Sequence, residues 1–193
     1  MSINNNTFYY ESKTFEKNDW SAQIIQHKEF EECTFKHCDF SDTILANNTF
    51  TDCTFVNCNM SNVNLNNASL KNVTFKDCKL LGVNFSECKD FLFYIKLDNC
   101  NADYCSFANK KMSKTCFYHC SLKDTNFTNT ILNNSLFEHC NLANALFNKT
   151  NLKEANMETA FNFIIDPELN EIKKCKFSIN GLLGLLAKYD IVV

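Results

Sequence analysis

A large apolar side chain recurs at every fifth position over most of the chain, and this spacing constrains the fold more than any other feature. The first run of this large series is Phe15, Trp20, Ile25, Phe30, Phe35, Phe40, Leu45, Phe50, Phe55, Met60, Leu65, Leu70, Phe75, Leu80 and Phe85. After a slip of two residues, the second run is Leu92, Leu97, Ala102, Phe107, Met112, Phe117, Leu122, Phe127, Leu132, Phe137, Leu142, Phe147, Leu152 and Met157. A period of five fits neither a helix nor a strand, so no isolated element could bury it.

A second series of small residues lies two positions before the large one. It includes Cys33, Cys38, Thr43, Cys53, Cys58, Val63, Ala68, Val73, Cys78, Val83, Cys100, Cys105, Thr115, Cys120, Thr125, Thr130, Ser135, Cys140 and Ala145. A coil of four five-residue sides can point both series inward, and stacked coils then bury a continuous core. We therefore predict an all-β fold, a right-handed quadrilateral parallel β-helix, over residues 13–163. Residues 1–12 are expected to form an N-terminal cap, and residues 164–193 a C-terminal cap with a short α-helix.

Four sides imply that residues 20 apart stack on one another. One side carries Phe15, Phe35, Phe55 and Phe75, whereas the side through Ile25 changes to phenylalanine from Phe85 onward. Aromatic residues thus cluster by side, which predicts ring stacks along the core at roughly the 4.8 Å spacing of neighbouring strands.

The twelve cysteines fall mostly in the small series and are expected to be reduced, buried thiols. A metal ladder, a redox relay or disulfide staples are the alternatives. Cys88, Cys116 and Cys175 break the pattern and are expected to be more exposed. His119 and His139 should stack at the surface. No nucleophile–base constellation and no phosphate-binding loop is evident, so we expect no enzyme activity, no cofactor and no metal site.

The charge of the chain excludes some partners. All 19 basic residues are lysine, and the formal net charge is −3. Arginine is the residue best suited to phosphate and guanine, so direct nucleic-acid binding is not expected. No apolar run is long enough to span a membrane, and the first residues lack the apolar segment of a signal peptide. We therefore expect a cytoplasmic protein without membrane contact.

The two-residue slip falls around Phe91–Leu97. One interpretation is a bulge that absorbs the extra residues, with Phe91 as a second core residue. The other is an exposed aromatic patch for a partner, and for it we name Phe93 and Tyr94. Acidic residues cluster on one side of the N-terminal coils and complete this candidate partner patch: Glu29, Glu31, Glu32 and Asp52. The same side later carries Lys111, Lys114 and Lys153.

The C-terminal residues carry more apolar side chains than a short cap can bury. A helix is expected from Ser178 or Asn180 to Lys188, with the serine or asparagine as its N-cap. The expected dimer interface comprises Leu182, Leu183, Leu186, Tyr189 and Ile191. The alternative is a monomer in which this segment is only a lid.

The repeat resembles the pentapeptide-repeat family, whose motif is a small residue, Asp or Asn, then Leu or Phe, then two polar residues. Matches stand at residues 38–40, 68–70, 83–85, 125–127 and 140–142, within a resemblance that spans roughly residues 13–162. Both ends and the central slip are similar to the quinolone-resistance (Qnr-type) subgroup.

This resemblance implies a cytoplasmic homodimer joined through C-terminal helices. It also implies a duplex-DNA mimic that binds a type II topoisomerase, DNA gyrase or topoisomerase IV, and modulates quinolone sensitivity. The register leaves no room for the projecting loops of some members. The alternative function is a structural or adaptor scaffold for an unrelated cytoplasmic protein.

Overall fold

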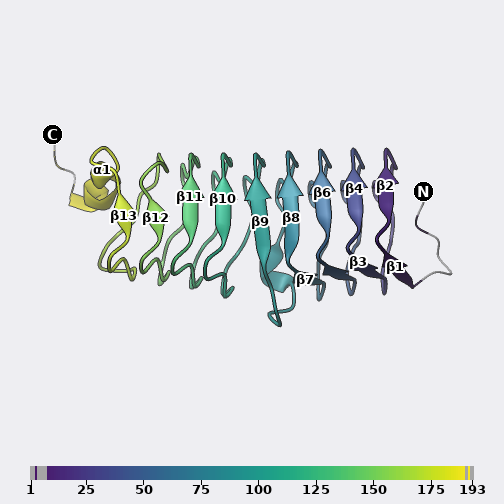
Figure 1. The fold of residues 1–193 in the computed structure, drawn as a ribbon. Helices are drawn as coiled ribbons and strands as arrows, with labels where there is room; N and C mark the ends of the chain where they lie inside the picture. Colours follow the sequence, from purple (N-terminus) through teal and green to yellow (C-terminus); the bar gives the residue numbers. More distant parts are fainter. Residues whose placement is uncertain (1–2, 4–7, 190, 192–193) are drawn as a thin grey trace.

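The computed structural model describes residue 3, residues 8–189 and residue 191. Within them the chain winds into an all-parallel β-solenoid of about eight turns, with a short helix at its C-terminal end (Figure 1). The predicted parallel β-helix is confirmed. Its coils stack into a straight rod, and the two ends of the chain lie at opposite ends of that rod.

Strands form on two of the four sides. Within the described residues, a nine-stranded sheet contains β2 (Thr14–Glu16), β4 (Thr34–Lys36), β6 (Thr54–Val56), β8 (Val73–Lys76), β9 (Ile95–Asp98), β10 (Cys116–Tyr118), β11 (Leu136–Glu138), β12 (Asn156–Met157) and β13 (Lys176–Phe177). A four-stranded sheet contains β1 (Tyr9–Glu11), β3 (Glu29–Glu31), β5 (Thr49–Thr51) and β7 (Ser69–Lys71). Partners lie 20 residues apart, except that Val73 pairs with Ile95 across the slip.

We number the coils 1 to 9 by their strands in the nine-stranded sheet, which is face 1. Each coil runs through face 4, face 1, face 2 and face 3 in that order. Face 2 is the ladder of single bridges that begins at Asp19, and face 3 is the ladder that begins at Ile24. Face 4 is the four-stranded sheet, which continues beyond the slip through bridges at Lys111, Ile131, Asn151 and Glu171.

The corners between faces explain the polar residues of the repeat. At nearly every corner one residue has a positive φ, between 50° and 64° for all the non-glycine cases. Asparagine and aspartate tolerate this left-handed region best among the residues with a Cβ. Asn47, Asn67, Asn129 and Asn134 are examples, and only at Gly82 does a corner use glycine among the described residues. The repeat therefore needs little glycine to turn.

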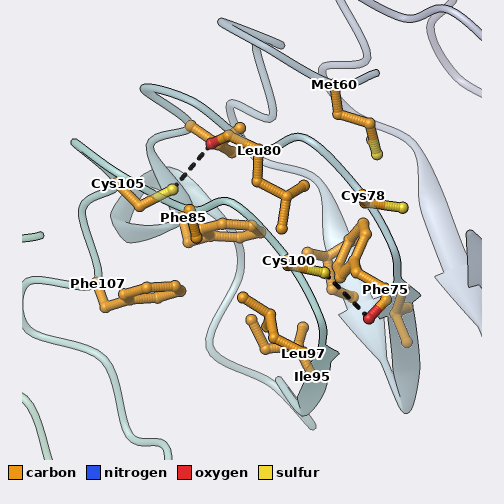
Figure 2. Close-up of a cluster of buried hydrophobic side chains, with 14 of the residues drawn as sticks. Met60, Phe75, Cys78, Leu80, Phe85, Ile95, Leu97, Cys100, Cys105 and Phe107 are labelled. Atoms are coloured by element: carbon orange, nitrogen blue, oxygen red, sulfur yellow. Dashed lines mark hydrogen bonds between the residues drawn. The ribbon is translucent and has the colours of Figure 1, made fainter. Parts of the chain in front are cut away.

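The small series is defined by hydrogen bonding as well as by size. Thr130 Oγ1 donates to the carbonyl of Phe107 at 2.9 Å, and Cys53 Sγ donates to that of Phe30 at 3.4 Å. Figure 2 shows the same contact from Cys105 to the carbonyl of Leu80. Each donor satisfies a buried backbone carbonyl of the preceding coil, which alanine or valine cannot do. This accounts for the abundance of cysteine, threonine and serine in the core.

The aromatic columns are present as expected. Phe117 stacks on Phe137 with ring centroids 4.8 Å apart, and Phe85 stacks on Phe107 at 4.9 Å. The cysteines are free rather than paired, and those of the small series are buried. Cys88 is also buried, at 5% exposure, so the expectation that it would be more exposed is wrong. It occupies the small position of face 4 just before the slip, whereas Cys116 and Cys175 are indeed half-exposed.

At the slip, the buried residues differ from those that the five-residue period predicts. Leu92 is 63% exposed and Phe91 is 72% exposed, so neither is a core residue. Phe93 takes the inward position instead and is 7% exposed. The extra residues form a loop between β8 and β9 that projects beyond the other corners (Figure 1). Phe93, rather than Leu92, is therefore the first large apolar residue of the slip whose side chain points into the core.

Both ends of the rod contain details that the pattern did not resolve. Tyr10 in β1 already stacks on Phe30, at 5.2 Å, so coil 1 includes residues that we assigned to the N-terminal cap. The helix α1 (Leu182–Leu186) begins later than expected and is followed by the 3₁₀ turn η2 (Ala187–Tyr189). Its N-cap is Gly181, without a side-chain cap. The 3₁₀ turn η1 (Phe85–Glu87) lies before the slip.

Candidate interaction surfaces

The acidic part of the candidate partner patch lies on face 4 near the N-terminal end. Glu29, Glu31 and Glu32 are exposed on coil 2, and Asp52 is exposed on coil 3. The parallel register sets these side chains on adjacent rungs. The phenol of Tyr9 donates to Glu31 at 2.6 Å, and this hydrogen bond raises the pKa of Tyr9 to about 12. The register therefore places the four carboxylates on one face of two neighbouring coils.

The aromatic part of that patch is only partly available. Phe93 is buried, so its ring cannot contact a partner, and this expectation is corrected. Tyr94 is 36% exposed, and burial raises its pKa, with a smaller contribution from Cys116. The exposed apolar side chains of the slip are Leu92, which the periodicity had assigned to the core, and Phe91, which one interpretation of the slip had placed there. They lie on the same face as the acidic residues, two coils beyond Asp52.

Lys110 holds the slip in place from inside the rod. It occupies a small position of face 4 but is a lysine, only 2% exposed. Its ammonium pairs with Asp90 at 2.7 Å, donates to the carbonyl of Cys88, and lies 5.0 Å from the centroid of the Phe93 ring. A buried ammonium requires such partners. Sequence reasoning missed this residue because a lysine interrupts the small series there.

The C-terminal apolar surface is exposed as the dimer prediction requires. Leu182, Leu183, Leu186, Tyr189 and Ile191 are all at least 38% exposed. The helix packs so closely on coil 8 that a Cβ on Gly184 would lie 2.1 Å from the carbonyl oxygen of Phe163. Lys188 pairs with Asp166 at 2.7 Å and with Glu168 at 2.9 Å. These contacts fix the orientation in which the leucines are presented.

A groove of about 540 Å³ lies between coil 8 and α1. It is lined by Glu158, Thr159, Ala160, Phe161, Asn162, Phe163, Ser178, Asn180, Gly181, Leu183 and Gly184. The groove exists because the helix leans over the last coil. His119 and His139 do not line it.

The two histidines stack on face 1, with ring centroids 5.1 Å apart, as predicted. Across the described part of the chain, no three His, Cys, Asp or Glu side chains are grouped so that they could hold a metal ion. Burial raises the pKa of Cys53 and of Cys88 to about 12, so these thiols stay protonated at neutral pH and are poor nucleophiles. No described helix is long and apolar enough to cross a membrane.

Comparisons with solved structures show the same fold. One trypsin-treated form of QnrB1, a plasmid-mediated fluoroquinolone resistance protein, aligns with a TM-score of 0.62 at 14% identity, over 96% of this chain and 99% of the other. HetL, involved in heterocyst differentiation regulation in the cyanobacterium Nostoc sp. strain PCC 7120, aligns with a TM-score of 0.64 at 12% identity, over 92% and 90%. No curated protein matches the sequence.

Two family models match the sequence itself. Residues 28–107 match the pentapeptide repeat region, and residues 120–158 match eight copies of the pentapeptide repeat. Both matches lie within the solenoid, and residues 108–119, in coils 5 and 6, separate them. With the five-residue inward pattern and the four-sided coils, they establish that this chain belongs to the pentapeptide-repeat family.

Proposed function

We propose that this chain is a non-enzymatic, cytoplasmic protein-binding rod. In this proposal it mimics duplex DNA, engages a type II topoisomerase such as DNA gyrase or topoisomerase IV, and modulates quinolone sensitivity. The supporting observation is the charge of coil 2, where five carboxylates lie at the surface of one turn of a narrow rod. They are Glu29, Glu31 and Glu32 on face 4, with Asp39 and Asp42 on face 2. The fold shared with QnrB1 is consistent with this partner.

The geometry explains why such a coil can attract a DNA-binding enzyme. Backbone stacking holds the three glutamates at fixed spacing on face 4, and it holds Asp39 and Asp42 on the opposite face 2, where Ser41 donates to Asp39 at 2.6 Å. That hydrogen bond, with others from Ser41 and Asn59, lowers the pKa of Asp39 against the effect of its partial burial. A fixed cluster of negative charge steers basic surfaces toward it.

A supercoiling assay tests this proposal. Purified chain is titrated into DNA gyrase, relaxed plasmid and ATP, with and without a fluoroquinolone. We expect altered supercoiling or reduced drug-induced cleavage. The triple variant E29K/E31K/E32K should lose the effect, while E154K/E158K/E171K, which reverses three exposed carboxylates at the other end of the rod, should retain it. No effect of the parent chain at large molar excess would reject the proposal.

A second candidate function is an adaptor scaffold for an unrelated cytoplasmic protein. Face 3 favours it, because its outward residues are almost uncharged. Asn67 donates to Asn47 at 2.7 Å, and Asn129 donates to Asn109 at 2.9 Å, which builds a flat amide ladder. A pull-down from lysate with the chain as bait should then return a partner whose capture survives E29K/E31K/E32K. Recovery of topoisomerase subunits alone would count against the adaptor.

We also propose that the C-terminal surface joins two copies of the chain tail to tail. Leu182, Leu183, Leu186, Tyr189 and Ile191 are the contact residues of this proposal. Light scattering should then show a species heavier than the 22.3 kDa chain. L182D/L186D should remove the contact without unfolding the rod, because both side chains point to solvent. An unchanged mass in that variant would show that the segment is only a lid.

A further inference from the structure

Face 4 is divided by charge along its length. Coils 1 to 4 carry five exposed carboxylates, Glu11, Glu29, Glu31, Glu32 and Asp52, against one lysine, Lys71. Coils 6 to 9 carry five exposed lysines, Lys111, Lys114, Lys153, Lys173 and Lys174, against Glu154 and Glu171. Leaving aside the buried Lys28 and Lys110, the first half therefore has a net charge of −4 and the second half of +3.

Within the described residues, these exposed charges have no ion-pair partner. None of the carboxylates or lysines of face 4 named above forms an ion pair with another described residue. Glu31, Glu32 and Asp52 accept hydrogen bonds from the neutral groups of Tyr9, Ser12 and Asn72. Like charges gathered on one surface without counter-charges are unfavourable unless a partner or ions screen them.

An apolar protrusion separates the two halves. Phe91 and Leu92 lie on coil 5, the middle coil of the nine, and are 72% and 63% exposed. Lys110 and Asp90 hold this loop in place from beneath, at 2.7 Å. The loop projects beyond the neighbouring corners (Figure 1). Exposed apolar side chains on a fixed loop are typical of a contact surface.

We propose that face 4 binds a second copy of this chain side by side and antiparallel. A two-fold axis through coil 5 would bring the two Phe91–Leu92 protrusions together. The same axis would set the acidic half of each copy against the basic half of the other. Such an interface is isologous, because both copies contribute the same surface. Each acidic half then contacts a basic half of the other copy.

The register of this pairing follows from the coil numbering. Coil 2, with Glu29, Glu31 and Glu32, would meet coil 8 of the second copy, with Lys153. Coil 1, with Glu11, would meet coil 9, with Lys173 and Lys174. Asp52 on coil 3 would lie one rung from Lys111 and Lys114 of coil 6. Lys71, which would approach those lysines, already lies 6.0 Å from the centroid of its own Phe91 ring.

This contact would cover Glu29, Glu31 and Glu32, which the topoisomerase proposal also uses, so the two partners would compete for face 4. The tail-to-tail contact is separate, because it uses the end of the rod. A chain with both contacts would assemble beyond a dimer, and its mass would rise with concentration. The variant L182D/L186D isolates the contact on face 4. In that background we expect a mass of twice 22.3 kDa.

Zero-length carbodiimide cross-linking gives the sharpest test. Glu29–Glu32 and Lys153 lie on coils 2 and 8, roughly 29 Å apart in one chain at ~4.8 Å per rung, so no link between them can form within a chain. We expect such links in the dimer band. The exposed pair Lys188–Asp166, at 2.7 Å, is the internal positive control. Formation of the control link alone would overturn the proposal.

Charge exchange gives a second test, again in the L182D/L186D background. E29K/E31K/E32K and K153E/K173E/K174E should each be monomeric alone, because each makes both halves of face 4 alike in charge. An equimolar mixture should form a heterodimer of twice the chain mass. All six positions are exposed, so folding should persist, and circular dichroism checks it. A monomeric parent, or a dimer that survives either variant alone, would contradict the antiparallel contact.

Discussion

The ion pair between Lys110 and Asp90 gives a prediction whose size can be worked from the geometry. Lys110 is 2% exposed, whereas the Asp90 side chain is 69% exposed. Removing one partner of a fully buried pair costs about 3–5 kcal/mol, whereas an exposed pair contributes about 0–1 kcal/mol. Asp90→Asn leaves the ammonium its contacts with the Cys88 carbonyl and the Phe93 ring. We therefore expect an intermediate loss of about 2 kcal/mol in the free energy of unfolding.

Lys110→Thr should cost less than Asp90→Asn, within about 1 kcal/mol of the parent. Replacing a buried charged side chain by an uncharged one that fits the site often changes the free energy of unfolding little. Threonine occupies the equivalent position in the next two coils, where Thr130 and Thr150 donate to carbonyls at 2.9 and 2.8 Å. In the Lys110→Thr background, Asp90→Asn should have no further effect.

Urea unfolding followed by circular dichroism measures these differences. Asp98→Asn is the matched control, because Asp98 is a half-exposed aspartate that forms no ion pair with a described residue. An Asp90→Asn variant as stable as this control would refute the reasoning. The reverse order, with Lys110→Thr the more damaging change, would refute it as well. Hydrogen exchange at Ile95 and Val73 would show whether the loss is local to the slip.

Three further predictions follow from the core and the N-terminal coils. Thr115 Oγ1 is buried and has no hydrogen-bond partner among the described residues, so Thr115→Val should raise the free energy of unfolding by about 1 kcal/mol. A lower free energy of unfolding in urea would contradict this. Phe117→Ala should lower the free energy of unfolding by about 3–5 kcal/mol, because it leaves a cavity. Phe117→Leu should lower it much less, since Leu97 fills the same column one coil earlier. Equal losses in the two variants would contradict the packing argument. The Tyr9 phenol should ionise near pH 12 rather than 10, so its contribution to stability is present below pH 10 and is lost as the pH rises through 12. Its midpoint is measured by subtracting the absorbance titration of Tyr9→Phe at 295 nm from that of the parent. A midpoint near 10 would contradict the hydrogen bond to Glu31.

The solenoid was predictable because one pattern, repeated at every rung, sets both the inward residues and the turns. A slip of two residues is different. Periodicity says that two residues are added between Cys88 and Ile95 but not which side chain returns to the core. The buried Phe93 ring lies 5.0 Å from the Lys110 ammonium, and this contact cannot be read from spacing. For the same reason the exposed Phe91 was a plausible core residue.

Spacing alone also failed to predict the burial of Cys88 and the first residue of α1. Cys88 looked irregular only because the large residue expected after it is displaced by the slip, although its own position is regular. The helix begins at Leu182 rather than after Ser178, because Gly181 and Gly184 must approach Phe163 closely. The acidic cluster on face 4 was predictable from 20-residue stacking alone. The later lysines of that side, Lys111, Lys114 and Lys153, were predictable in the same way. The exposed Phe91 and Leu92 between the two halves were not, because the slip decides which side chains leave the core.

We propose that the rod acts by binding a type II topoisomerase in place of DNA. Competition binding tests it most directly, with immobilised DNA gyrase, the purified chain in solution and linear duplex DNA as competitor. We expect saturable binding of the chain that falls as DNA is added and weakens in E29K/E31K/E32K. Absence of binding, or binding that excess DNA leaves unchanged, would contradict the account.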